Sequence, residues 1–162
     1  MMRSWLAAIS ASASALAGDK RGALGLIGQA RDLLETASGR EEWMYDFDPS
    51  SLAVYQGQCH LRIGQPGAAM SAVEAGLASL PDGCERRKAG LMAQLAEACL
   101  PAGKPETAMA YARQALDIYA RRGSAAGLHQ IGAICLLGQT AGYQRHAREL
   151  KLHLDEYVPD SK

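Results

Sequence analysis

The side chains that could do chemistry are scattered along this sequence. Of the four histidines, only His146 and His153 share a helical face, two turns apart, and no cysteine or carboxylate is placed to complete a metal site with them. The sequence contains no G-x-S-x-G, H-E-x-x-H, Walker or G-x-G-x-x-G motif. These patterns predict no catalytic centre, no metal site and no cofactor, and therefore a protein that is not an enzyme.

The four cysteines form no C-x-x-C pair and no regular short spacing, which argues against a zinc site or a redox dithiol. We expect them to be small apolar core residues in a reducing compartment, and we therefore predict a cytoplasmic protein. The alternative is export, because Arg3 and the segment 5–17 resemble a secretory signal with its cleavage site. The cysteines are Cys59, Cys84, Cys99 and Cys135.

The composition excludes several classes of protein. A length of 162 residues allows one domain of ordinary size or one short array of repeats. Alanine and leucine supply 50 residues, whereas valine and isoleucine supply nine, so the balance of propensities excludes an all-β fold. Basic and acidic residues number 17 each, which leaves no broad positive field for direct binding of nucleic acid. No apolar run approaches the ~18–20 residues of a membrane span.

One short signature, a glycine followed five residues later by an alanine, recurs along the chain. Successive pairs are 46, 39 and 39 residues apart. Each glycine lies between two amphipathic stretches, so the unit is a helix, a tight turn at the glycine and a second helix, in which the alanine permits close approach. Pro66 and Pro105 fit the first turn of a second helix. The pairs are Gly18/Ala23, Gly64/Ala69, Gly103/Ala108 and Gly142/Ala147.

We therefore predict an all-α fold of eight helices, a right-handed α-solenoid of about four helix-turn-helix repeats in a single domain over residues 1–162. The units cover about 4–36, 50–83, 85–122 and 125–157, and an acidic-aromatic connector covers 37–49. The expected helices are 4–17, 20–36, 50–63, 66–79, 85–100, 105–121, 125–140 and 143–157.

The repeats resemble the tetratricopeptide repeat, whose motif combines W-x2-L-G-x2-Y, A-x3-F and a closing proline. In the second unit Gly57, Ala69, Val73 and Pro81 occupy the motif's glycine, alanine, phenylalanine and proline positions. No unit has the motif tryptophan, and the terminal units are the least regular, as in capping repeats. The resemblance implies a stack of helical pairs with a concave wall.

A second resemblance covers the segment from Trp43 to Gly64, which is similar to the carboxy-terminal helical-repeat domain of actinomycete helix-turn-helix regulators. The family's amino-terminal DNA-binding part has no counterpart in this sequence. The chain would then be either a stand-alone relative or a fragment. The resemblance implies a regulatory, transcription-associated role through a DNA-binding partner or a lost domain, and it transfers no DNA binding to this chain.

In such a stack the first helix of each pair lines the concave wall, and the helical period selects the residues that face it. The wall is expected to be mixed in character, which suits a peptide, a protein segment or a small polar signal molecule. Each aromatic or charged member could equally be a core or solvated residue. The candidate groove residues are Trp5, Tyr55, Gln58, Arg62, Gln94, Glu97 and His129. The same period adds Ile9 and Ser12 in the first unit, Val54 and Leu61 in the second, Ala93 and Leu100 in the third, and Ala133, Leu136 and Gln139 in the fourth.

The connector 37–49 combines acids with three aromatic residues, which a merely flexible linker would lack. One interpretation is that the aromatics fill the gap between the first two helical pairs while the acids stay in water. The other is a lid over the groove. The candidate lid residues are Trp43, Tyr45 and Phe47.

The sequence thus favours a non-enzymatic module that binds a peptide, a protein segment or a small signal in a concave groove. The alternative is a structural adaptor or a homodimeric scaffold with no ligand. Neither hypothesis includes direct contact with nucleic acid or a membrane.

Overall fold

The computed structural model describes residues 2–36 and 47–158. Within these two ranges the chain forms eight α-helices and no strand, which confirms the predicted all-α class. None of the helices in these ranges has both the length and the apolar character needed to cross a bilayer. The helices fall into two compact units, Met1–Leu80 and Pro81–Lys162, and each unit is described by itself.

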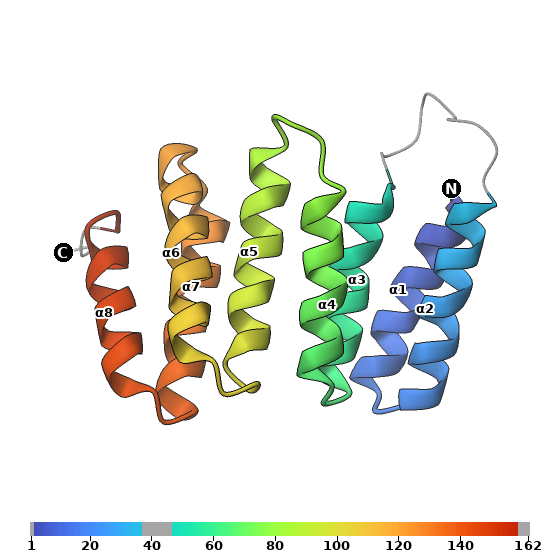
Figure 1. Ribbon diagram of the computed structural model, residues 1–162, viewed down its shortest axis with the longest axis horizontal. Helices are drawn as coiled ribbons and strands as arrows, with labels where there is room; N and C mark the ends of the chain where they lie inside the picture. The colour runs from blue at the N-terminus through green and yellow to red at the C-terminus, as the bar shows by residue number, and fades with distance from the viewer. Residues whose placement is uncertain (1, 37–46, 159–162) are drawn as a thin grey trace. The chain divides into compact units, whose positions relative to one another are not determined.

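Unit 1 contains two helix pairs. Within each pair the helices are antiparallel and packed together, α1 with α2 and α3 with α4, and α3 also contacts both α1 and α2 (Figure 1). The first helix of the second pair therefore lies against both helices of the first. The helices are α1 (Met2–Leu16), α2 (Lys20–Glu35), α3 (Pro49–Arg62) and α4 (Pro66–Ala78).

Unit 2 repeats this arrangement. The helices α5 and α6 form one pair and α7 and α8 the other, while α7 contacts both α5 and α6, and α8 contacts α6. The helices are α5 (Glu85–Cys99), α6 (Pro105–Arg121), α7 (Ala125–Thr140) and α8 (Gln144–Asp155). In both units the predicted helix bounds agree with the observed ones to within about two residues.

The four glycine turns are confirmed. Gly18, Gly64, Gly103 and Gly142 all have positive φ, between 74° and 89°, and each follows the first helix of a pair. At each turn the amide after the glycine donates to a carbonyl of the preceding helix five residues earlier, as in a Schellman motif. The four alanines that follow at the predicted spacing are fully buried. The turn and the small residue together set how closely the two helices of a pair approach.

The helix starts use both prolines and side-chain caps. Pro66 and Pro105 lie in the first turn of α4 and α6, as predicted. Asp48, expected to be a solvated acid, instead caps α3: it is half-buried and its Oδ1 accepts from the Ser51 amide and the Ser50 hydroxyl at 2.7 Å. A carboxylate at this position satisfies a helix amide that would otherwise lack a partner.

The cores differ in the size of their side chains. In unit 1, α1 buries only small residues, and the hydroxyl of its Ser4 donates to the Ala30 carbonyl at 2.6 Å. In unit 2 the fully buried side chains include large aliphatic residues from all four helices, namely Leu91, Leu95, Leu100, Leu116, Ile131, Ile134 and Leu150. The buried residues of α1 are Ser4, Ala7, Ala8, Ala11 and Ala15.

The cysteines are free thiols, and three of them are core residues as predicted. Cys59, Cys99 and Cys135 are buried, whereas Cys84 is half-buried at the start of α5. Burial raises the pKa of the Cys59 thiol, and a hydrogen bond with Ser12 opposes this shift.

Gly127 marks the tightest contact between α6 and α7. A Cβ atom placed on Gly127 would lie 2.3 Å from ring carbons of Tyr119, whereas one on Gly132, further along α7, would come no closer than 3.7 Å to Leu154. Only the first glycine is required by packing. The second has room for a methyl group.

We predict opposite effects for alanine at these two positions. Gly127→Ala should lower the free energy of unfolding by about 1–2 kcal/mol, because overpacking costs ~1–3 kcal/mol and the gain in helix propensity is only about 1 kcal/mol. Gly132→Ala should raise it by up to about 1 kcal/mol. Urea unfolding followed by far-UV circular dichroism measures both changes, and a Gly127→Ala variant as stable as Gly132→Ala would contradict the contact.

Candidate functional site

Four of the candidate groove residues belong to unit 1, where two of them meet. The indole Nε1 of Trp5 on α1 donates a hydrogen bond to the Tyr55 hydroxyl on α3, at 3.2 Å. Trp5 remains 40% exposed and Tyr55 is half-buried. Gln58 is half-buried one turn further along α3, and Arg62 is exposed in its last turn. The structure thus brings Trp5 and Tyr55 into direct contact on the surface of unit 1.

Of the three candidate lid residues, the structure describes Phe47. Its side chain is 5% exposed and belongs to the core of unit 1, with its ring centroid 6.0 Å from that of Tyr55. In this position Phe47 fills space beside α3, as the gap-filling interpretation expects. Trp43 and Tyr45 lie outside the described residues.

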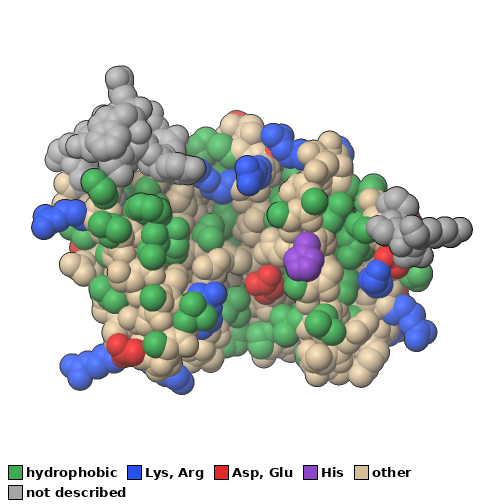
Figure 2. Space-filling view, turned by 180° about the vertical axis from the view of Figure 1, so that it is seen from behind, with side chains coloured by type: hydrophobic (Ala, Val, Ile, Leu, Met, Phe, Trp, Pro, Cys, Tyr) green, Lys and Arg blue, Asp and Glu red, His purple; other side chains and the backbone are tan. Residues whose placement is uncertain are grey.

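Exposed hydrophobic side chains also occur on α1. Met2, Leu6 and Ile9 are exposed together with Trp5, and Arg3 is the only charged residue of the helix. In the space-filling view hydrophobic side chains gather on the surface of unit 1 (Figure 2). This surface is therefore largely apolar.

In unit 2 a polar network replaces part of the expected open wall. Glu97 of α5 accepts a hydrogen bond from Gln130 Nε2 of α7 at 3.2 Å, and the Tyr119 hydroxyl of α6 donates to Gln130 Oε1 at 3.0 Å. Burial, followed by the negative charge of Glu97, raises the pKa of Tyr119, which keeps this donor protonated. Gln94, expected at an open groove, is only 3% exposed. Gln130 therefore joins three helices, and Glu97 is one of its two partners.

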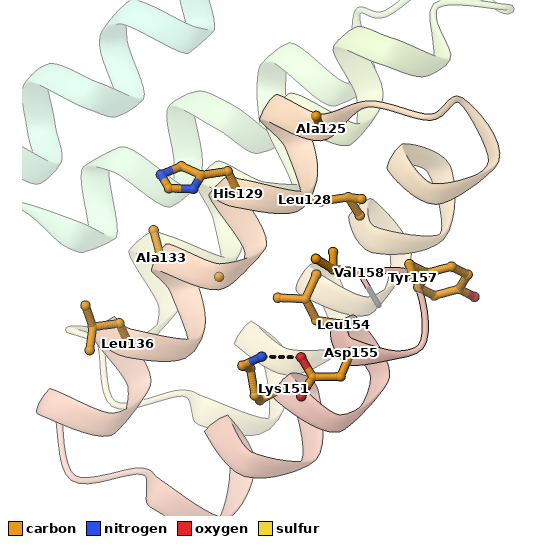
Figure 3. Close-up of a pocket in the computed structure, with 11 residues that line it drawn as sticks. Ala125, Leu128, His129, Ala133, Leu136, Lys151, Leu154, Asp155, Tyr157 and Val158 are labelled. Carbon is orange, nitrogen blue, oxygen red and sulfur yellow. Dashed lines mark hydrogen bonds and ion pairs between the residues drawn. The ribbon is translucent and has the colours of Figure 1, made fainter. Parts of the chain in front are cut away.

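A hollow of unit 2 lies between α7 and α8. It has a volume of about 680 Å³ and is lined mainly by apolar side chains. Successive turns of α7 present His129, Ala133 and Leu136, and Leu154 lies across from them on α8, followed by Tyr157 and Val158 (Figure 3). The remaining lining residues are Ala125, Leu128, Gly132, Lys151 and Asp155.

The charged groups at this cavity compensate each other. The Lys151 ammonium and the Asp155 carboxylate, one turn apart on α8, form an ion pair (Figure 3). Cys135 lies close enough to feel both charges: burial raises the pKa of its thiol to about 11, Lys151 lowers it by less, and Asp155 raises it slightly. The cavity thus presents an apolar surface with one ion pair and an exposed histidine.

Sequence reasoning identified the α7 side of this cavity and missed the α8 side. His129, Ala133 and Leu136 were expected to face a groove and line the cavity. The residues of α8 were not considered, although Lys151, Leu154, Asp155 and Val158 follow the i, i+3, i+4, i+7 spacing of one helical face. That spacing is the signal that could have found them.

Comparisons with known proteins identify no relative. No family model, curated protein or solved structure matches this chain. The similarity to tetratricopeptide repeats and to regulator domains therefore rests on the residues quoted above.

The arrangement of side chains in both units supports binding. In the described ranges no three His, Cys, Asp or Glu side chains are grouped so that they could hold a metal ion. At the α7–α8 cavity the available interactions are apolar contact, one ion pair and the imidazole of His129. Groups of these kinds fix and orient ligands in known binding sites.

Because Phe47 is buried, we predict that removing its side chain destabilises the fold. Phe47→Ala should lower the free energy of unfolding by about 3 kcal/mol, because the variant leaves a cavity beside α3. Tyr55→Phe, which removes only the exposed hydrogen bond to Trp5, should cost less than about 1 kcal/mol. Urea denaturation of both variants makes the comparison, and a Phe47→Ala variant of unchanged stability would argue for a lid.

The thiols should differ in reactivity. A pKa of about 11 in place of 9.0 leaves Cys135 with about a hundredfold less thiolate at any pH below about 9, and burial slows access further. We expect iodoacetamide to label Cys84 first and the three buried cysteines only on unfolding. Peptide mass mapping after a time course in native buffer and in urea measures the order. Early labelling of Cys135 in native buffer would contradict its burial.

Proposed function

We propose that this protein is a non-enzymatic binding module that captures a peptide or protein segment, and that the α7–α8 cavity is its principal site. The observation that carries the proposal is the apolar cavity of about 680 Å³, whose lining includes the exposed side chains of Leu136, Tyr157 and Val158. A few polar groups at an apolar hollow are typical of binding sites.

Binding at this cavity would be favoured by the hydrophobic effect. Large apolar side chains at the cavity remain in water, and covering them releases about 25 cal/mol for each Å² of apolar surface. The ion pair between Lys151 and Asp155 leaves the site with little net charge, so it does not select a strongly charged ligand. A segment with apolar side chains fits this site better than a polyanion.

The finer architecture is part of the proposal. We infer a right-handed α-solenoid of about four tetratricopeptide-like repeats. The supporting observations are the positive φ of the four turn glycines Gly18, Gly64, Gly103 and Gly142, the last three of which are 39 residues apart, the buried alanine after each of them, and the recurrence in both units of a helix packed against a pair. In this architecture the first helices of the pairs provide the binding wall.

The cellular role is a hypothesis built on the regulator resemblance. The module would act in the cytoplasm, relaying capture of its partner to transcription through a protein that binds DNA. Its own balance of 17 basic and 17 acidic residues gives no reason to expect direct contact with nucleic acid.

A second candidate function, a homodimeric scaffold, is favoured by one observation. The exposed side chains of Met2, Trp5, Leu6 and Ile9 form an apolar stretch on α1 that a second copy could cover. In that case light scattering would detect a dimer that Leu6→Glu dissociates. A monomer at micromolar concentration would exclude it.

The proposed function is tested with a matched pair of variants. Peptides selected from a displayed library against the whole chain should lose at least about tenfold in affinity with Leu136→Glu, which places a charge at the cavity. Leu152→Glu is the control, because Leu152 on α8 is 62% exposed, as against 61% for Leu136, but does not line this cavity. Isothermal titration measures both.

Two results of this experiment would contradict the cavity assignment. One is that the selected peptides bind the two glutamate variants equally well. The other is that their affinity depends instead on Tyr55→Ala or Arg62→Ala, which would move the site to the predicted groove residues of unit 1.

A further inference from the structure

The packing of α7 within unit 2 indicates what the α7–α8 cavity is shaped to hold. The helix α7 lies against both helices of the preceding pair, α5 and α6, just as α3 lies against α1 and α2 in unit 1. The first helical pair of each unit therefore receives one further helix between its two members. The pair α7 and α8 has no such helix among the described residues of unit 2.

A shift of 39 residues, the distance from Gly103 to Gly142, relates the cavity to the corresponding positions of the pair α5 and α6. Moving back by this distance takes the α7 residues Leu128 and Gly132 to Ala89 and Ala93 of α5. Both of these alanines are fully buried.

The α8 side of the cavity follows the same rule. The shift takes Leu154 and Val158 to Ala115 and Tyr119 of α6, which are also buried. Most of the lining of the cavity thus occupies, one repeat later, positions that are buried in the pair α5 and α6.

Direct contacts establish that α7 is what covers part of this earlier surface. The Tyr119 ring lies against Gly127, where a Cβ would approach to 2.3 Å, and Gln130 bonds to both Tyr119 and Glu97. The contacts that hold α7 on the preceding pair are therefore made by Gly127 and, three residues later, by the side chain of Gln130.

We propose that the α7–α8 cavity is a seat for a single α-helix of a partner protein, docked as α7 docks on α5 and α6. The inference deepens the proposed binding function and rests on it. The bound helix would carry a small residue at the place of Gly127 and aliphatic residues at the places of the buried Ile131 and Ile134. It would lie along α7 and α8 in the hollow of Figure 3.

The α7–α8 cavity differs from the surface of α5 and α6 at the two positions that would contact the partner residue equivalent to Gln130. The 39-residue shift puts Leu136 where the earlier pair has Glu97, and Val158 where it has Tyr119. Two groups that bond an amide are thus replaced by two aliphatic groups. An amide buried there would lose its hydrogen bonds, so the partner helix should carry leucine, isoleucine or methionine at this place.

The test uses two synthetic helical peptides that copy residues 124–140, with lysine and glutamate at positions outside the seat for solubility. One carries leucine at the place of Gln130 and the other keeps glutamine. Fluorescence anisotropy with the full chain should give at least about a tenfold tighter binding for the leucine peptide. A third peptide, with proline in its centre, should not bind, since it cannot form a continuous helix.

Replacing Leu136 and Val158 by the residues at the equivalent positions of α5 and α6 should make the chain bind the glutamine peptide more tightly than the leucine peptide. The double variant Leu136→Glu, Val158→Tyr restores the groups that bond Gln130 in the earlier pair, and we expect it to prefer the glutamine peptide. Both original side chains are exposed, so the variant should fold normally, as circular dichroism can verify. Binding of the leucine peptide by the double variant at unchanged affinity would overturn the inference.

The remaining outcomes separate this inference from the proposed function. In one outcome, library peptides bind in a way that depends on Leu136 but neither helical peptide binds. In another, the proline peptide binds as well as the others. Either result would support the binding module and contradict the helical partner. If no peptide binding depends on Leu136, both fail. Concentration-dependent self-association that Leu136→Glu abolishes would replace the partner helix by a second copy of this chain.

Discussion

Close approach of helix backbones, permitted by alanine and glycine, is the constraint on which both units depend. The alanines that follow the glycine turns are fully buried, and a Cβ on Gly138 of α7 would lie 3.3 Å from that of Ala147 on α8. Larger residues at these positions would push the two helices of a pair apart. The positive φ of each turn glycine reverses the direction of the chain within a few residues, so that the second helix packs antiparallel to the first.

This constraint explains why much of the fold could be predicted from the sequence. Turn glycines, first-turn prolines and helical periodicity are local signals, and they located the helices to within about two residues. The capping role of Asp48 was missed, because a carboxylate before Pro49 reads equally as a solvated acid until its partners Ser50 and Ser51 are known.

The candidate site was predicted less completely, for a physical reason. The helical period identifies a face but not what covers it. It offered His129, Ala133 and Leu136, which line the α7–α8 cavity, but also Ala93, Gln94 and Leu100, which the structure buries. The polar network of Glu97, Gln130 and Tyr119 joins helices that are distant in sequence, and no local pattern contains that information. The contribution of α8 depends on its packing against α7 in the same way.

The side-chain distribution of α1 has a consequence for dynamics. This helix turns one serine and four alanines inward and leaves Leu6 and Leu16 more than half exposed, so it contributes no large side chain of its own to the core of unit 1. The helices of unit 2, anchored by leucine and isoleucine, lack this weakness. Fraying should therefore start at the amino-terminal helix, whose amide protons would exchange with deuterated solvent well before those of α5 or α7.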